Sequence, residues 1–158
     1  MVLQHIPSSP KSALPDLFAS RCELQVKEAE DKENILPGYI YFAPPNYHLL
    51  IEREKHFSLS VEEAVNYSRP SIDLLFESAA VAYRNRLGGI ILTGANSDGA
   101  VGLRAVAKYN GLTIVENPAS SYEPFMPRAA LSIVQPDYVL GVEEIAACLA
   151  SGSMAEVE

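Results

Sequence analysis

Short apolar runs and longer helical repeats alternate along this chain. The runs end at polar, proline or glycine residues, which is typical of buried strands. They predict strands at residues 1–4, 39–43, 48–51, 57–60, 89–93, 112–115 and 138–140. Apolar residues three and four positions apart, together with cap residues, predict helices at residues 14–21, 72–86, 100–109, 127–134 and 143–150. The run 89–93 lacks alternation, as expected of a parallel strand that is covered on both faces.

The order of these elements predicts an α/β fold. Helices and strands alternate from residue 70 onward, and the segment 89–115 is expected to form one right-handed βαβ unit. In its helix, Val101, Leu103 and Val106 are expected to face inward. We predict a three-layer α/β/α sandwich with a mostly parallel, doubly wound sheet and an antiparallel β-meander at 38–60. The charged stretch 26–34 is predicted to be a solvated surface segment.

Composition narrows the class of protein. The chain has 158 residues, enough for one domain, and its net charge of -8 makes nucleic acid or an anionic membrane surface an improbable partner. No apolar stretch approaches the roughly 20 residues of a membrane span, so no membrane insertion is expected. Cys22 and Cys148 are isolated, which indicates a reducing compartment and a cytoplasmic protein.

Two polar residues follow the carboxyl ends of predicted strands. His5 follows the strand at 1–4, and Asp98 lies in the loop after the strand at 89–93. If both strands are parallel, both side chains lie at the same edge of the sheet, where open α/β sheets bind ligands. An aspartate that orients a histidine supplies two members of a nucleophilic triad. The alternatives are a surface histidine, and an aspartate that only caps its own helix.

The glycine-rich loop 94–102 also invites an anion-binding interpretation. Its glycines match neither G-x-G-x-x-G nor a P-loop, because Ala100 and Val101 stand where Lys and Ser or Thr are needed. Backbone N–H groups at a helix N-terminus could still hold a phosphate or an oxyanion. His48 and His56 fall in predicted strands without neighbouring Cys or paired carboxylates, so no metal site is expected.

Six motifs, in order along nearly the whole chain, resemble the catalytic domain of the CheB protein-glutamate methylesterases. They are Gln4-His5-Ile6-Pro7 (family Q-H-M/I-P), Val26 to Asp31 followed by Leu36-Pro37-Gly38 (V-x-E-A-x-D-G-x-x-L-x-P-G), Tyr41-Phe42-Ala43-Pro44 with His48 (Y-I-A-P and a following His), Arg69-Pro70-Ser71-Ile72-Asp73-Leu74-Leu75-Phe76 (R-P-S-V-D-x-L-F), Ile91 to Ala100 (L-T-G-M-G-x-D-G-A) and Met126-Pro127-Arg128-Ala129-Ala130 (M-P-x-x-A).

The resemblance implies an activity and its residues. The family's enzymes hydrolyse γ-glutamyl methyl esters on chemoreceptor helices with a Ser-His-Asp triad, and some deamidate glutamines. By resemblance, the histidine is His5, the aspartate is Asp98, and the backbone N–H of Ala95 is the oxyanion donor. No cofactor is implied. The implied partners are methylated cytoplasmic chemoreceptor helices, with a receiver domain on another chain as a second candidate.

The nucleophile departs from the family pattern. The family's serine lies in a G-A-S-x-G-G turn on a strand before Q-H-x-P, and this sequence contains no such turn. Ser8, Ser9, Ser97 and the serines at 151 and 153 lie in other contexts. We therefore expect a methylesterase domain at 1–151 that lacks the family's first strand, a flexible tail at 152–158, and a native start upstream of Met1.

Two consequences and two alternatives follow from the missing turn. The printed chain is predicted to be inactive by itself, and the strands beside the missing one are expected to expose unpaired edges that favour self-association. The first alternative is a catalytically inactive receptor-binding module. The second is a small-anion binding domain that uses the loop 94–99, where Arg128 could add charge or could simply lie on a helix surface.

Overall fold

The central sheet is parallel and lies between helices. The structure, a computed structural model, describes residues 1–5 and 13–152. Strands β5 (Gly88–Ile91), β6 (Leu112–Glu116) and β7 (Tyr138–Leu140) pair in the order β5-β6-β7, all parallel. Most of β6 is buried, which explains why its sequence does not alternate. The strands predicted at 89–93, 112–115 and 138–140 are confirmed within two residues at each end.

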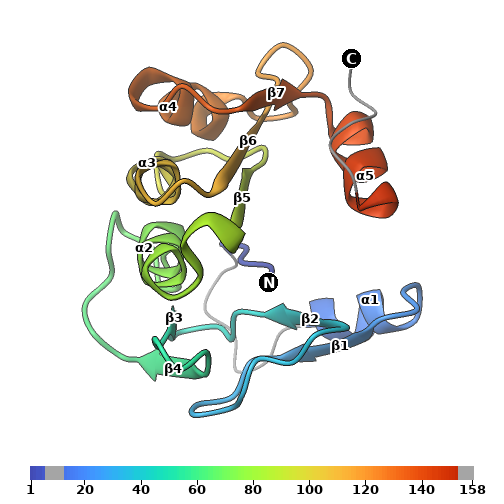
Figure 1. Cartoon of the computed structure of the whole chain (residues 1–158), viewed down its shortest axis with the longest axis vertical. Coiled ribbons are helices and arrows are strands. Elements are labelled where there is room, and N and C mark those ends of the chain that lie inside the picture. The colour runs from blue at the N-terminus through green and yellow to red at the C-terminus, as the bar shows by residue number, and fades with distance from the viewer. Residues whose placement is uncertain (6–12, 153–158) are drawn as a thin grey trace.

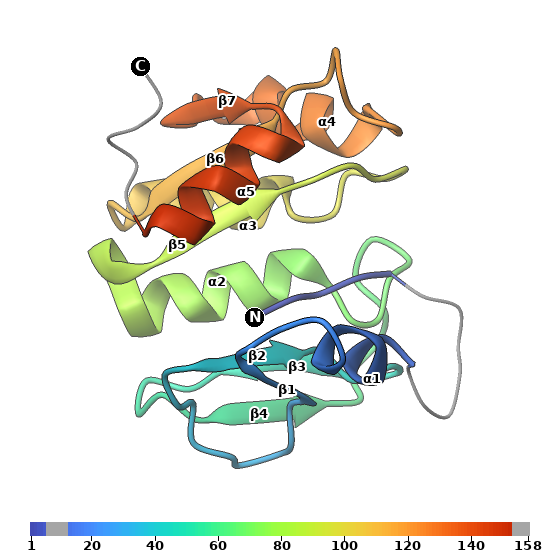
Figure 2. The same cartoon turned by 90° about the vertical axis from the view of Figure 1, so that its right-hand side faces the viewer.

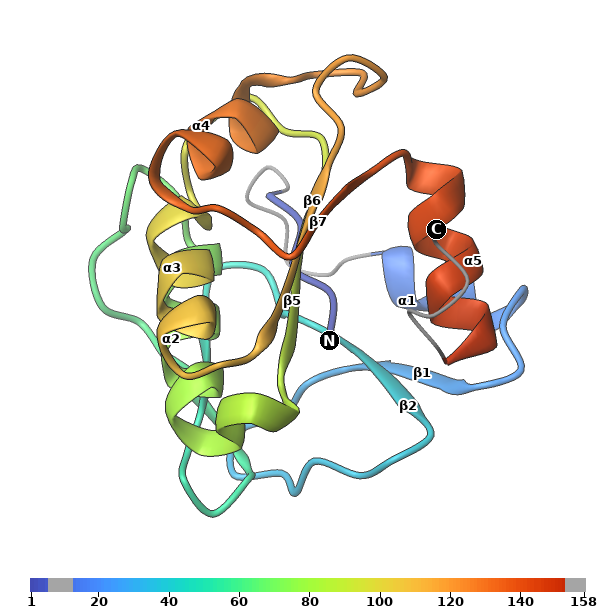
Figure 3. The same ribbon diagram turned by 45° about the horizontal axis from the view of Figure 1, so that its top comes forward.

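Helices cover both faces of this sheet. Helices α2 (Ile72–Tyr83), α3 (Ala100–Lys108) and α4 (Phe125–Ile133) lie on one side, and α5 (Val142–Ser151) lies on the other (Figures 1 and 3). Helix α1 (Leu14–Ala19) is on the α5 side and packs against the strand Gln25–Glu28. A short 3₁₀ helix (Arg84–Arg86) joins α2 to β5. The predicted α/β class with three layers is confirmed, and every predicted helix is present with small shifts at its ends.

The first half of the described chain adds two small strand pairs. Strands β1 (Gln25–Glu28) and β2 (Tyr39–Phe42) pair in parallel, and β3 (His48–Ile51) and β4 (Phe57–Ser60) form an antiparallel hairpin. The antiparallel part of the predicted meander is thus the β3–β4 hairpin. Strand β2 does not join it, because it pairs with β1 instead.

The charged stretch 26–34 begins with a strand that was not predicted. Its first residues belong to β1, and Ala29, only 3 % exposed, donates its N–H to the Phe42 carbonyl. The Lys27 ammonium bonds to the carboxylates of Glu30 and Glu33 at 2.8 and 2.9 Å, and these bonds raise the pKa of Lys27. Lys27 lies in β1, whereas Glu30 and Glu33 follow that strand, so these charges pair at its end. Apart from Ala29, residues 26–34 are exposed or half-buried, as expected of a surface segment.

The chain start lies beside β2. Val2 forms a parallel bridge with Phe42, donating its N–H to the Tyr41 carbonyl and accepting from Ala43 N–H. The strand predicted at 1–4 is therefore reduced to one bridging residue. Residues 1–5 run between β2 and the β5-β6-β7 sheet (Figure 2), which brings His5 toward the edge where β5 ends.

Three apolar cores hold these layers. One joins the hairpin to α2 through Tyr41, Leu49, Phe57 and Leu75, another packs α3 and α4 on the sheet, and the third packs α5 on the opposite face. The buried residues of α3 are Ala100, Gly102, Leu103 and Val106. The prediction that Val101 also faces inward is wrong, because it is 41 % exposed on another face of the helix.

Candidate active site

His5 and Asp98 meet although 93 residues separate them in sequence. The Nε2 atom of His5 lies 2.8 Å from Oδ2 of Asp98. The His5 side chain is 24 % exposed, whereas the Asp98 side chain is fully buried. His5 is held there by the pairing of Val2 with β2, and Asp98 by the turn that leads from β5 into α3. The structure thus brings the two residues together at the carboxyl end of the parallel sheet.

The Asp98 carboxylate accepts four hydrogen bonds. Besides His5, its donors are the Ser71 hydroxyl (2.8 Å) and the backbone N–H groups of Ile72 (2.6 Å) and Asp73 (3.0 Å). Burial by itself would raise the pKa of Asp98, but the four hydrogen bonds outweigh it and hold the pKa below its ordinary value. Asp98 is therefore ionised and fixed in orientation, as an aspartate that steadies an imidazole must be.

The same contacts show that Asp98 caps α2. Ile72 and Asp73 are the first two residues of that helix, whose orphan N–H groups need acceptors. Ser71 stands at the N-cap position, but its hydroxyl bonds to Asp98 and makes no cap hydrogen bond of its own. The alternative that Asp98 only caps its own helix, α3, is wrong, because its carboxylate is directed at α2.

Helix α3 is capped in return by α2. One carboxylate oxygen of Asp73 accepts the N–H groups of Gly99 (2.9 Å) and Gly102 (2.7 Å). Burial raises the pKa of Asp73, and the nearby charge of Asp98 raises it further, against hydrogen bonds that lower it. Because a carboxylate already occupies the N-terminus of α3, that end offers no open anion site. The small-anion interpretation loses its structural basis there, and Arg128 is an exposed residue of α4.

A second histidine, His48, accepts a hydrogen bond from the backbone of Ser71. His48 is fully buried, its Nδ1 atom accepts the N–H of Ser71 at 3.2 Å, and its Nε2 atom lies 3.0 Å from the Glu63 carbonyl. Since Nδ1 accepts, Nε2 carries the proton and donates it to that carbonyl. His48 is therefore a structural link between the hairpin and the start of α2.

Asn96 contacts His5 from the other side. Its Nδ2 atom lies 3.1 Å from His5 Nδ1, and its Oδ1 atom accepts the N–H of Asp98 at 3.0 Å. The loop 93–99 therefore touches both ring nitrogens of His5. Next to Asn96, Ala95 is an exposed residue, and its N–H donates no hydrogen bond to any part of the chain that the structure describes.

Glycines give this loop its tight path. Gly99 has a φ of +95°, and a Cβ there would come within 2.5 Å of Ile91 Cδ1 and 2.8 Å of Ile72 Cγ2. Gly94 lies against Met126. The Met126 N–H donates to the Gly94 carbonyl, and the Gly94 N–H donates to the Glu123 carbonyl. These contacts tie the loop to the start of α4, so the positions of Ala95 and Asn96 follow from packing on both sides.

No serine hydroxyl in residues 1–5 and 13–152 bonds to His5. Ser71 lies on the far side of Asp98, and Ser97 is an exposed residue beside it. Ser8, Ser9 and Ser153 lie outside the described residues, and Ser151 bonds to the Cys148 carbonyl at the end of α5. The described part of the chain holds a histidine, an aspartate and the Ala95 N–H, which can accept a proton and stabilise an oxyanion.

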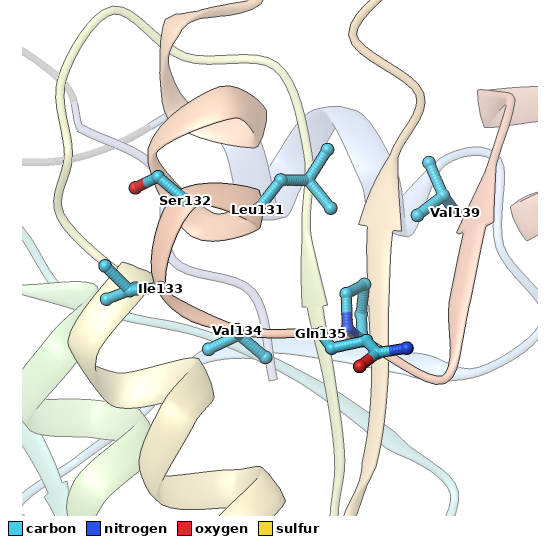
Figure 4. Close-up of a pocket in the computed structure, with 7 residues that line it drawn as sticks. Leu131, Ser132, Ile133, Val134, Gln135 and Val139 are labelled. Carbon is cyan, nitrogen blue, oxygen red and sulfur yellow. The ribbon is translucent and has the colours of Figure 1, made fainter.

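One cavity lies away from this chemistry. It measures about 620 Å³ and is lined by Leu131, Ser132, Ile133, Val134, Gln135, Pro136 and Val139 (Figure 4). These residues lie before and within β7, at the amino end of the sheet. They include no acid or base, so we place the candidate site at the Asp98 edge. Within the described ranges, no three His, Cys, Asp or Glu side chains are grouped to hold a metal ion.

The contributions of Asn96, Ser71 and Asp73 were not predicted from the sequence. One signal was present: Ser71 precedes one helix with Asp73 in its first turn, and Ser97-Asp98-Gly99 precede another, and such polar residues are typical of helix starts. The sequence does not show that each carboxylate caps the other's helix.

No helix in the described ranges has the length and apolar content that crossing a bilayer requires.

Known proteins share this fold and much of this sequence. A crystal structure of the Thermotoga maritima CheB methylesterase catalytic domain superposes with a TM-score of 0.88 at 34% identity, over 94% of this chain and 80% of that one. A putative protein-glutamate methylesterase/protein-glutamine glutaminase of Leptospira interrogans (strain Fiocruz L1-130) is 48% identical over 92% of this chain and 76% of its own length.

A more distant relative gives the same result. The protein-glutamate methylesterase/protein-glutamine glutaminase of Escherichia coli (strain K12) is 36% identical over 84% of this chain, which spans 39% of that longer protein. A family model described as CheB methylesterase matches residues 1–149. The resemblance drawn from the six motifs is confirmed, and the chain belongs to the CheB methylesterase family.

Proposed function

We propose that this chain carries the acid–base part of a protein-glutamate methylesterase, which hydrolyses γ-glutamyl methyl esters on cytoplasmic chemoreceptor helices. Deamidation of receptor glutamines is a second reaction of the same site. The single observation that carries the proposal is the 2.8 Å contact between His5 and the buried carboxylate of Asp98. Relatives named for both activities support it.

The reaction assigns one role to each group. One ring nitrogen of His5 bonds to Asp98, and the other takes the proton from a nucleophilic hydroxyl as it attacks the ester carbonyl. The Ala95 N–H stabilises the negative oxygen of the tetrahedral intermediate. The proton then passes from His5 to the departing methoxide, giving methanol. Water repeats the cycle on the acyl-enzyme and leaves the free γ-carboxylate.

The partner's helix would approach the edge that carries His5. Tyr122 and Phe125 are 97 % and 55 % exposed. Glu123, which lies between them, accepts a hydrogen bond from the Gly94 N–H through its carbonyl, so this segment is next to the loop of the site. Exposed aromatic side chains beside a site are suited to a partner protein rather than to a small ester. We infer a cytoplasmic protein that meets receptor helices at this edge, with a receiver domain on another chain as a further partner.

The test measures methanol release from a methylated receptor helix. Two forms are compared: the printed chain, and a longer form that carries the family's G-A-S-x-G-G turn ahead of Met1. We expect no release above buffer from the printed chain and clear turnover from the longer form. In the longer form, His5→Gln and Asp98→Asn should each lower kcat by roughly 10³–10⁴-fold. Full activity of the His5→Gln variant would contradict the proposal.

A receptor-binding module without catalysis is the second candidate. It is favoured by one observation: in the described ranges no serine hydroxyl contacts His5. The same experiment separates the two. Binding to the receptor helix by both forms, with no methanol released by the longer form, would support the binding module and reject the esterase.

A further inference from the structure

Both ring nitrogens of His5 are engaged by one short loop. Nε2 contacts Asp98 Oδ2 at 2.8 Å, and Nδ1 contacts Asn96 Nδ2 at 3.1 Å. A single hydrogen bond would leave a partly exposed ring free to swing about its side-chain torsions. Two bonds at different ring atoms fix both its plane and its direction. Asn96 therefore has a geometric effect on His5 that Asp98 by itself cannot have.

The direction of the Asn96 amide is set by the backbone. The Asp98 N–H lies 3.0 Å from Asn96 Oδ1, and a backbone N–H can only donate. The amide oxygen must therefore face Asp98, which leaves the NH₂ group facing His5. The usual ambiguity between the two ends of an asparagine amide does not arise here.

The NH₂ group in turn selects one form of the ring. It can only donate, so it can pair with His5 Nδ1 only when that nitrogen carries a lone pair. Asp98, which is ionised, accepts from Nε2, so that nitrogen must carry the proton. Both contacts select the same neutral tautomer, with the proton on Nε2 and the basic lone pair on Nδ1.

We propose that Asn96 is a positioning residue that holds His5 in its Nε2-protonated form and so makes Nδ1 the general base. This role in the reaction rests on the proposed esterase function. The nucleophile's hydroxyl hydrogen-bonds Nδ1 in place of the Asn96 amide hydrogen. As its oxygen bonds to the ester carbon, the proton moves to Nδ1, and it leaves later with methoxide. Nε2–H stays on Asp98 throughout.

The test is the ¹⁵N NMR spectrum of the three histidines in the printed chain, with His5 assigned from a His5→Gln variant. We expect a protonated Nε2 and an unprotonated, hydrogen-bonded Nδ1 in the unsubstituted protein at neutral pH. Asn96→Asp keeps the oxygen that accepts from Asp98 but replaces the donor NH₂ with an acceptor. It should therefore protonate Nδ1, and the Nδ1 signal should move to the position of an N–H nitrogen.

Asn117→Asp is the matched control. Asn117 also accepts a backbone N–H two residues ahead, that of Ala119, at 2.9 Å, so this change adds the same charge to the same kind of turn away from His5. It should leave the His5 signals unchanged. If Asn96→Asp does not fold, Asn96→Ala replaces it, and the Nδ1 signal should then move toward that of a nitrogen without a donor.

Two results would overturn the proposal: a protonated Nδ1 in the unsubstituted protein, or Asn96 variants whose His5 signals match those of Asn117→Asp. The spectrum requires no turnover. A protein with the expected signals but no esterase activity in its longer form would therefore reject the proposed function and leave the role of Asn96 in fixing the ring.

Discussion

Helices α2 and α3 are both capped at the N-terminus by a buried aspartate, but the two aspartates differ in their other contacts. Each N-terminus is capped by a carboxylate that belongs to the other helix's start: Asp98 caps α2, and Asp73 caps α3. Both aspartates are buried. Only Asp98 also reaches His5, whereas the remaining oxygen of Asp73 accepts from Asn66 at 3.0 Å.

The difference lies in where the second oxygen points. Capping fixes a carboxylate by backbone donors and makes it a rigid acceptor. At Asp73 that rigidity joins the two helices and, through the second oxygen, Asn66 in the loop before α2. At Asp98 the free side of the same rigid group faces the edge of the sheet, where a histidine can use it. A candidate catalytic aspartate can thus arise from a structural cap by one further contact.

Removing each carboxylate in turn should give the largest effects and tests the difference between Asp98 and Asp73 directly. Asp98→Ala leaves two backbone N–H groups and the Ser71 hydroxyl without an acceptor and should lower the free energy of unfolding by about 3–5 kcal/mol. Asp73→Ala leaves the Gly99 and Gly102 N–H groups unpaired and should cost about 2–4 kcal/mol. Urea unfolding followed by circular dichroism measures both.

The two variants should differ in their effect on His5. Only Asp98→Ala removes the acceptor of Nε2–H, so only it should change the protonation pattern of His5 in the ¹⁵N spectrum. Under conditions where both variants remain folded, an equal change in Asp73→Ala would show that the two caps are not separable, and the comparison would fail.

The close approach of the two helices gives the next largest effect. A Cβ at Gly102 would lie 2.7 Å from Phe76 Cβ and 2.9 Å from the backbone Cα and O atoms of Asp73. Since backbone atoms cannot turn aside, Gly102→Ala should push α3 from α2 and lower the free energy of unfolding by about 1–3 kcal/mol. The measurement is again urea unfolding.

Gly88→Ala is the control for that substitution. A Cβ at Gly88 would meet no atom within 4 Å, so this change should alter the stability by less than about 1 kcal/mol, in the stabilising direction if at all. Equal losses in the two variants would mean that helix contact at Gly102 is not what limits the substitution.

The periodic helices and strands could be predicted well from the sequence. The capping of α2 by Asp98 and of α3 by Asp73 could not. The helix and strand order from residue 70 onward follows from apolar spacing, because burial on a sheet or helix face imposes that spacing directly. Val101 was misplaced because an apolar residue two positions from Leu103 lies on a different helical face. Strand β1 was missed because the partners that pair the charge of Lys27 are visible only in three dimensions.

The candidate site shows the same limit. His5 and Asp98 could be placed at one edge from strand direction, because the carboxyl ends of parallel strands meet there. Asn96 could not be given a role, since its effect depends on which atom faces the Asp98 N–H. Asp73 lies in the first turn of α2, and Asp98 comes directly before the N-cap residue of α3. Only the packing of α2 on α3 shows that each aspartate caps the other helix.

The most subtle expected difference between the two aspartates lies in the pH dependence of stability. The pKa of Asp98 is held below its ordinary value of 3.8, so its stabilising contribution is present above 3.8 and is lost as the pH falls through the lower folded-state pKa. The pKa of Asp73 is raised above 3.8 by burial and by the charge of Asp98. The folded protein therefore takes up this proton before the unfolded chain does, and acidification toward 3.8 favours the folded state.

Substituting each aspartate by asparagine tests these two opposite slopes. Asp98→Asn also removes the charge that raises the pKa of Asp73, so its effect is read below pH 3.8. The free energy of unfolding is measured with urea between about pH 3 and pH 7 for the unsubstituted protein, Asp73→Asn and Asp98→Asn. The unsubstituted protein minus Asp73→Asn should give a difference that falls as the pH rises above 3.8, where only the folded state holds the Asp73 proton. The difference from Asp98→Asn should rise with pH below 3.8, where only the unfolded chain holds the Asp98 proton. Constant losses from altered hydrogen bonds cancel in these slopes. Slopes of the same sign for both residues would mean that their environments do not shift the two pKa values in opposite directions. The contrast between Asp73, which caps a helix, and Asp98, which caps a helix and also holds His5, would then have no electrostatic basis.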